Sequence, residues 1–121
     1  MTLHGHLAKL PNRTMNRKQQ ALYEARARVV KALAHPTRLF LVDELARRER
    51  CVAELTRMVG ADMSTVSKHL SILKAVGIVQ DLKRGARVIY RLRVPCILKF
   101  FDCASEVLET VAEQQLKCIR G

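Results

Sequence analysis

Four cysteines, Cys51, Cys96, Cys103 and Cys118, are the side chains best suited to bind a soft metal ion or to undergo redox chemistry. None of them forms a CxxC pair, so neither a zinc ribbon nor a thioredoxin-like site is indicated. Cys96 and Cys103 are seven residues apart, which places them on one face of a helix with Phe100 between them. A metal site there needs a third ligand, for which Cys51 is the candidate. Cys118 is expected to be a packing residue.

Residues 62–76 contain a second group of chemically useful side chains, short hydroxyls followed by basic residues. Apolar residues recur there at spacings of three and four, which predicts a helix with one apolar stripe: Val66, Leu70, Leu73 and Val76. Asp62 is a suitable N-cap and Gly77 a suitable stop. A short helix over 51–59, closed by Gly60, precedes it, so the pair predicts a helix-turn-helix whose second helix enters the DNA major groove. The expected contacts to bases or phosphates are made by Ser64, Thr65, Ser67, Lys68 and His69.

Two strand-like runs follow, 78–83 and 86–92, and they flank Arg84-Gly85, where glycine allows the positive φ of a tight hairpin turn. The hairpin tip carries Lys83, Arg84 and Arg87, which we expect to contact phosphates. A basic hairpin beside a recognition helix predicts a winged helix-turn-helix, mainly α with a small β-hairpin.

Helices are also expected over about 20–34, 37–48 and 96–117. In the second of these, Arg38 could touch a phosphate, but an ion pair with Glu54 is the favoured interpretation. The last helix has an apolar seam that steps by four and three, with more apolar surface than one small domain can cover. That surface predicts a homodimer, paired through Ile97, Phe101, Ala104, Leu108 and Val111.

The length of 121 residues predicts one domain, 20–121, preceded by a basic arm, 1–19. The net charge of +11 is concentrated in residues 1–35 and 62–93, with seven Lys/Arg in each, which favours attraction to nucleic acid over uniform solubilisation. Only five aromatic residues are present, so base-stacking platforms for RNA are not indicated. Neither a membrane span nor a secretion signal is evident, which predicts a cytoplasmic protein without a membrane partner.

Several segments, in this order, resemble the ArsR/SmtB family of bacterial metal- and metalloid-responsive repressors over about residues 20–117. They are 33–39 (LAHPTRL), 51–55 (CVAEL), 64–77 (STVSKHLSILKAVG) and 85–92. The resemblance implies a homodimer paired through its first and last helices, so that Leu22 and Val29 join the interface. It also implies that the dimer binds double-stranded operator DNA until an inducer lowers the affinity.

Sensing sites differ among members of this family, so the inducer has to be inferred from the ligands present. Arsenic-sensing members carry Cys-Val-Cys before the recognition helix; Cys51 matches the first cysteine, but Ala53 replaces the second. The zinc and nickel site of other members uses carboxylates and histidines on the last helix, and residues 96–121 contain no histidine. The expected ligands are therefore Cys51, Cys96 and Cys103. Three sulfur ligands suit As(III) or Sb(III) as inducer, or else Cd(II) or Pb(II).

Three alternatives remain open from the sequence. The same cysteines could respond to oxidation or persulfide formation instead of a metal ion. If all four are packing residues, the chain would be a constitutive DNA-binding protein. A thiol-dependent enzyme is not favoured, because no histidine base lies near any cysteine in sequence and no glycine-rich phosphate loop occurs.

Overall fold

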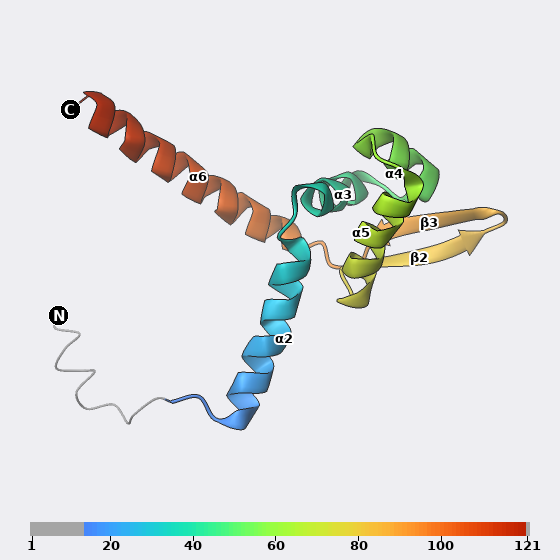
Figure 1. Cartoon of the computed structure of the whole chain (residues 1–121), viewed down its shortest axis with the longest axis horizontal. Coiled ribbons are helices and arrows are strands. Elements are labelled where there is room, and N and C mark those ends of the chain that lie inside the picture. Colours follow the sequence, from blue (N-terminus) through green and yellow to red (C-terminus); the bar gives the residue numbers. More distant parts are fainter. Residues whose placement is uncertain (1–13, 121) are drawn as a thin grey trace. The chain divides into compact units, whose positions relative to one another are not determined.

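The structure, a computed structural model, describes residues 14–120, which form helices and one small sheet (Figure 1). In chain order the elements are α2 (Arg17–Leu33), α3 (Pro36–Arg47), β1 (Arg50–Cys51), α4 (Val52–Val59), α5 (Met63–Ala75), β2 (Val79–Arg84), β3 (Arg87–Leu92) and α6 (Ile97–Arg120). The chain divides into two compact units, Met1–Lys31 and Ala32–Gly121. The predicted fold class, mainly α with a small β-hairpin, is confirmed.

Helix α2 begins three residues earlier than the sequence analysis predicted. The side chain of Asn16 accepts a hydrogen bond from the Gln19 backbone N–H (2.9 Å), and the Gln19 side chain accepts one from the Asn16 N–H (3.0 Å). This reciprocal pair satisfies two backbone donors at the start of the helix, so Arg17 is already helical. Of the predicted basic arm, residues 17–19 therefore belong to α2, and residues 1–13 lie outside the described residues.

The helix-turn-helix predicted around Gly60 is present. Helix α4 ends at Gly60, whose φ of +77° is the left-handed conformation that glycine adopts without strain. Helix α5 follows after Asp62, its N-cap by backbone conformation. At its other end the N–H of Gly77 donates to Lys74 O and that of Ile78 to Leu73 O, both at 3.0 Å. This paired pattern satisfies the last free carbonyls of the helix.

The three strands form an antiparallel sheet in the order β1-β3-β2. Arg84 pairs with Arg87, so the hairpin turn consists of Gly85 and Ala86, one residue later than predicted. Strand β1 was not predicted, because its two residues are too few to show a period. It pairs Arg50 with Tyr90 and so attaches the start of α4 to the edge of the hairpin.

The apolar core lies among α3, α4, α5 and the sheet. Its fully buried side chains come from each of these elements: Leu41, Val42, Leu55, Val66, Leu70, Leu73 and Val79. A chain of ion pairs borders this core. Arg50 lies 3.2 Å from buried Glu44 and 3.5 Å from Glu54, and Glu54 in turn lies 3.2 Å from Arg48. These pairs connect α3 to the first turn of α4 through the residues between them.

Helix α6 has no buried residue along its 24 residues. Leu108 is 71 % exposed and Val107 is 62 % exposed, although both are large and apolar. Exposed apolar surface of this extent on one helix is typical of an interface that a single chain leaves open.

Shortening a fully buried side chain of this core should cause a large loss of stability. Leu55→Ala should lower the free energy of unfolding by about 2–5 kcal/mol, because it removes transfer free energy and leaves a cavity. Urea denaturation at a fixed protein concentration measures this change. Ile72→Ala, at a position that is 42 % exposed on α5, is the matched control and should cost less than half as much. Equal losses would place Leu55 outside the cooperative core.

Candidate nucleic-acid interface

The first turns of α5 carry the predicted reading residues on the side away from the core. Ser64, Thr65 and Lys68 are exposed and Ser67 is partly exposed, whereas Val66 between them is fully buried. The apolar stripe therefore determines which hydroxyl and amino groups face outward. The structure brings these four side chains together as predicted, on a 13-residue helix with a free N-terminal end.

Asp62 organises the hydroxyl groups at this end of α5. Its carboxylate accepts a hydrogen bond from Ser64 Oγ at 3.0 Å. Hydrogen bonds from Thr65 and then Ser64 hold the pKa of Asp62 below its usual value, so the carboxylate stays ionised. The hydroxyl groups of Ser64 and Thr65 are thus both engaged with Asp62, which leaves Ser67 and Lys68 as the less committed donors.

His69 is placed differently from the other predicted reading residues. Its Nδ1 lies 3.2 Å from Arg38 Nη1, and its ring lies against that of His35, with centroids 4.4 Å apart. The preferred prediction for Arg38, an ion pair with Glu54, is wrong: Arg38 contacts His69 and donates from Nε to the Ala32 carbonyl. Glu54 pairs with Arg48 and Arg50, which are nearer to it along the chain. No local sequence signal connects α3 to His69.

The hairpin tip presents the predicted basic residues. Lys83, Arg84 and Arg87 are all exposed, and Arg84 lies directly opposite Arg87 in the strand register. Two like charges at directly opposed positions repel each other. Glu49 offsets part of this repulsion, because its carboxylate lies 3.1 Å from Arg84 Nη1. Glu49 thus already neutralises part of the charge of Arg84. An incoming phosphate would therefore relieve more repulsion at Arg87 than at Arg84.

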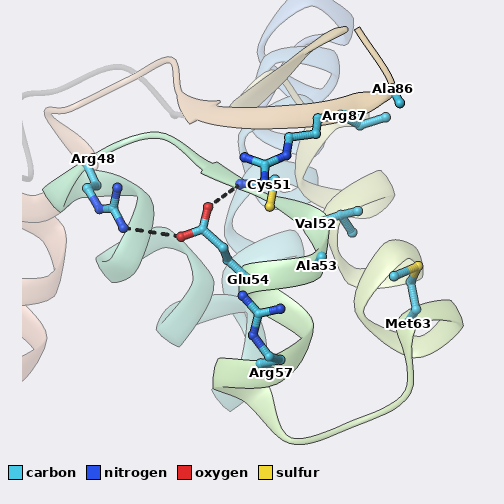
Figure 2. A pocket seen from close by; sticks show the side chains of 10 residues that line it. Arg48, Cys51, Val52, Ala53, Glu54, Arg57, Met63, Ala86 and Arg87 are labelled. Carbon is cyan, nitrogen blue, oxygen red and sulfur yellow. Dashed lines mark hydrogen bonds and ion pairs between the residues drawn. The ribbon is translucent and has the colours of Figure 1, made fainter. Parts of the chain in front are cut away.

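A cavity of about 640 Å³ opens between the start of α4, the start of α5 and the hairpin tip (Figure 2). Three arginines line it, Arg48, Arg57 and Arg87, against a single carboxylate, that of Glu54. Its remaining wall is formed by Cys51, Val52, Ala53, Met63, Ala86 and Val88. The excess of guanidinium groups makes the cavity suited to an anion. Arg48 and Arg57 were not predicted, since they lie in a segment with almost no net charge and gather only on folding.

Glu54 fixes the inner wall of this cavity. Its Oε1 accepts a hydrogen bond from the backbone N–H of Cys51 at 3.2 Å, which caps α4. That bond is the main cause of the lowered pKa of Glu54, followed by a hydrogen bond from the Cys51 thiol and by the charges of Arg48 and Arg50. Glu54 therefore remains a carboxylate and cannot itself act as an anion receptor.

The cysteines occupy two kinds of environment. Cys51 is buried, 6 % exposed, and its sulfur lies among the side chains that line the cavity (Figure 2). Cys96, just before α6, and Cys103 and Cys118 within it are exposed. Among residues 14–120 of one chain, no three His, Cys, Asp or Glu side chains are grouped so that they could hold a metal ion. A trithiolate of Cys51, Cys96 and Cys103 is thus not formed within the single chain. Ala53 lines the same cavity and contributes no ligand.

The predicted pairing residues are accessible to a partner. On α6, Ala104, Leu108 and Val111 are exposed, and Ile97 and Phe101 are partly exposed. On α2, Leu22 is exposed and Val29 partly so. None of the helices that the structure describes is both long and apolar enough to cross a membrane.

Comparison with known proteins connects this geometry to a family. Residues 35–81, from the N-cap of α3 into β2, match the sequence pattern described as "Bacterial regulatory protein, arsR family". An uncharacterized HTH-type transcriptional regulator of Mycobacterium tuberculosis, Rv0081, is 33% identical over 98 residues, which cover 80% of this chain and 86% of the relative. The HTH-type transcriptional repressor SmtB of the same organism is 39% identical over 71 residues, 59% of this chain and 53% of the repressor.

Solved structures agree with the sequence comparison. The crystal structure of M. tuberculosis Rv0081 aligns with a TM-score of 0.70 at 33% identity, covering 78% of this chain and 96% of that one. The homodimeric winged helix-turn-helix DNA-binding domain of Mb0332 from Mycobacterium bovis aligns with a TM-score of 0.70 at 31% identity, covering 85% and 95%. This chain belongs to the arsR family of bacterial transcriptional regulators and has their winged helix-turn-helix fold.

Proposed function

We propose that two copies of this chain form a repressor that holds operator DNA through α5 and the hairpin, and that releases it when cysteine thiols bind a soft inducer. The observation that carries the DNA-binding part is the arginine-lined cavity. It opens between the first residue of α5, Met63, and the hairpin tip at Ala86 and Arg87. A helix in the major groove and a hairpin in the neighbouring minor groove are separated by one sugar-phosphate strand, which is what such a cavity would receive.

The exposed side chains would have different roles in DNA binding, according to their chemistry. Thr65, Ser67 and Lys68 are short or flexible hydrogen-bonding groups on the outer face of α5, suited to base edges and adjacent phosphates. Arg57 and Arg87 present guanidinium groups from the cavity wall, and these suit phosphate without regard to sequence. Lys83 and Arg84 extend the positive charge along the hairpin.

Dimerisation would cover the apolar face of α6. A twofold dimer also provides two reading helices, which suits an operator of two half-sites. The M. bovis neighbour is described as homodimeric, and this supports the same assembly here. We place Ile97, Phe101, Ala104, Leu108 and Val111 of α6 in the interface, together with Leu22 and Val29 of α2.

The inducer that we propose is As(III), or else Sb(III), Cd(II) or Pb(II). The support is chemical: Cys51, Cys96 and Cys103 offer soft sulfur ligands, and no alternative set of three His, Cys, Asp or Glu side chains occurs among residues 14–120 of one chain. Since those thiols do not converge within one chain, the proposed site takes ligands from both chains of the dimer. Cys96 and Cys103 would contribute from exposed positions, and Cys51 from the cavity beside the DNA-reading residues.

A thiol-redox or persulfide response is the second candidate. It would use the same cysteines and is favoured by the exposure of Cys96 and Cys103, since an accessible thiol reacts with oxidants without the fixed geometry that a metal ion requires.

The DNA-binding proposal predicts two different losses. Ser67→Ala should weaken binding to the cognate operator by about 1–3 kcal/mol, and binding to random DNA by less, because a base contact is sequence-dependent. Arg57→Ala and Arg87→Ala should weaken binding to both DNAs and lower the slope of log affinity against log salt by about one unit each. Fluorescence anisotropy over a salt series measures both effects.

Lys117→Ala is the matched control for charge, since it removes one positive charge from α6. It should leave the salt slope unchanged. An unchanged slope for Arg57→Ala and Arg87→Ala as well would mean that the cavity does not receive the DNA backbone. Equal losses on both DNAs for Ser67→Ala would remove Ser67 from sequence reading.

The interface proposal predicts that Leu108→Glu disrupts the dimer, because pairing would then bury an unpartnered carboxylate. Sedimentation at micromolar protein concentration should show a shift toward the monomer. Thr110→Glu places the same charge on the opposite side of α6 and should remain dimeric. If both variants sediment as dimers, α6 does not pair along this face.

The inducer proposal predicts that As(III), under reducing conditions, dissociates the wild-type protein from its operator. A coupling of about 3 kcal/mol would lower the affinity roughly 150-fold. Changing Cys51, Cys96 or Cys103 to Ser should abolish release and preserve DNA binding, because a hydroxyl is a poor ligand for a soft ion. Cys118→Ser is the control and should respond as wild type. Release by an oxidant but not by As(III) would instead support the redox response.

A further inference from the structure

Three side chains from two helices meet beside the reading face of α5. His35 is the N-cap of α3, Arg38 lies in the first turn of α3, and His69 lies in the middle of α5. The rings of His35 and His69 are tilted by 43° with centroids 4.4 Å apart, and Arg38 Nη1 lies 3.2 Å from His69 Nδ1. Arg38 Nε also donates to the carbonyl of Ala32, so the guanidinium is held by two partners.

Hydrogen-bond chemistry determines the protonation of both rings. A guanidinium can only donate, so Nδ1 of His69 must accept and therefore carries no proton. The backbone N–H of Thr37 donates to Nδ1 of His35 at 3.0 Å, so that nitrogen carries no proton either. Each ring is therefore neutral, with its hydrogen on Nε2. Protonating either ring at Nδ1 removes a hydrogen bond that the fold uses.

The surroundings of His69 disfavour its charged form. Burial is the main cause that lowers the pKa of His69, followed by the electrostatic influence of its neighbours His35 and Arg38. On β2, the carboxylate of Asp81 pairs with Lys74, more than a turn further along α5. Asp62, nearly two turns earlier, accepts from Ser64. A protonated His69 would thus lie beside the cationic guanidinium of Arg38, while the carboxylates of Asp81 and Asp62 already have other partners.

We propose that Arg38 and His35 are positioning residues for DNA recognition: they hold the neutral ring of His69 and so fix the orientation of α5, and protonation of His69 releases it. The inference rests on the proposed DNA-binding function. His69 is one residue from Lys68 and two from Ser67, so a change at its ring is transmitted directly to the reading face. His69 thus acts through α3 and not through a base or phosphate.

The direction of the pH dependence follows from proton linkage. The pKa of His69 in the folded chain is below its ordinary value of 6.5. Between these two pKa values, the unfolded or released state therefore binds more protons than the folded chain does. The stabilisation is therefore complete above about pH 6.5 and is lost as the pH falls through the folded-state pKa. Operator affinity should decrease in the same window.

The test compares operator and random DNA between pH 7.5 and pH 5.5 at constant salt. Wild-type affinity for the operator should fall by at least about threefold, because one linked proton contributes up to about tenfold per pH unit. Affinity for random DNA should stay constant or rise, since acidification adds positive charge that attracts phosphate. A fall in affinity for the operator alone would therefore be opposite in direction to the change that simple charge attraction causes.

Three variants isolate the cluster. His69→Asn places Oδ1 where Nδ1 accepts from Arg38 but cannot titrate, so the operator affinity should lose its pH dependence. His35→Asn keeps an acceptor at the N-cap but removes the ring that lies against His69, so the pH dependence should become smaller. Arg38→Met removes the donor, and its loss of operator affinity should already be present at pH 7.5. His4 and His6 are unchanged in every variant and cancel in the comparison.

Imidazole nitrogen chemical shifts give a readout that needs no DNA. Both His35 and His69 should be Nε2–H tautomers at pH 7.5, and thermal melts check that each variant is folded. An equal pH slope in wild type and His69→Asn, or a charged His69 at pH 7.5, would overturn the positioning role. Failure to bind DNA at any pH would instead overturn the proposed function, with the tautomers still testing the cluster.

Discussion

The packing of one narrow apolar stripe determines how the rest of this structure can work. Val66, Leu70 and Leu73 have no exposed surface, and a helix with a single such stripe can be buried in only one rotation about its axis. That rotation turns Thr65 and Lys68 outward. It also leaves His69 at the edge of the buried surface, where it can reach α3. The face that α5 presents is thus set first by buried residues that take no part in its chemistry, and His69 then contacts α3 from its edge.

Local patterns predicted most of the fold because local forces create those parts. Gly60 and Gly77 end helices through backbone conformations that other residues adopt at a cost, and the apolar period of α5 gives its buried face without knowledge of its partner. Gly85 indicated the hairpin for the same reason, with an error of one residue in the turn. The two-residue strand β1 escaped prediction because its pairing with β3 depends on residues about forty positions later.

Contacts between distant residues account for what the sequence did not show. Arg38 contacts a residue 31 positions away, whereas the sequence favoured an ion pair with Glu54, because the packing of α3 against α5 cannot be read from either segment alone. Arg48 and Arg57, which come from a segment with almost no net charge, join Arg87 of the basic hairpin around one cavity. The cysteines were identified by type, but whether three thiols converge depends on the partner chain, which one sequence does not place.

The bare apolar face of α6 has a consequence for how such a regulator would be controlled. If that face is covered only by a second copy, dimer formation depends on the square of the monomer concentration at low protein levels. Occupancy of a twofold operator would then rise more steeply with protein abundance than a monomer could achieve. Synthesis and degradation of the chain would themselves tune repression, in addition to any inducer.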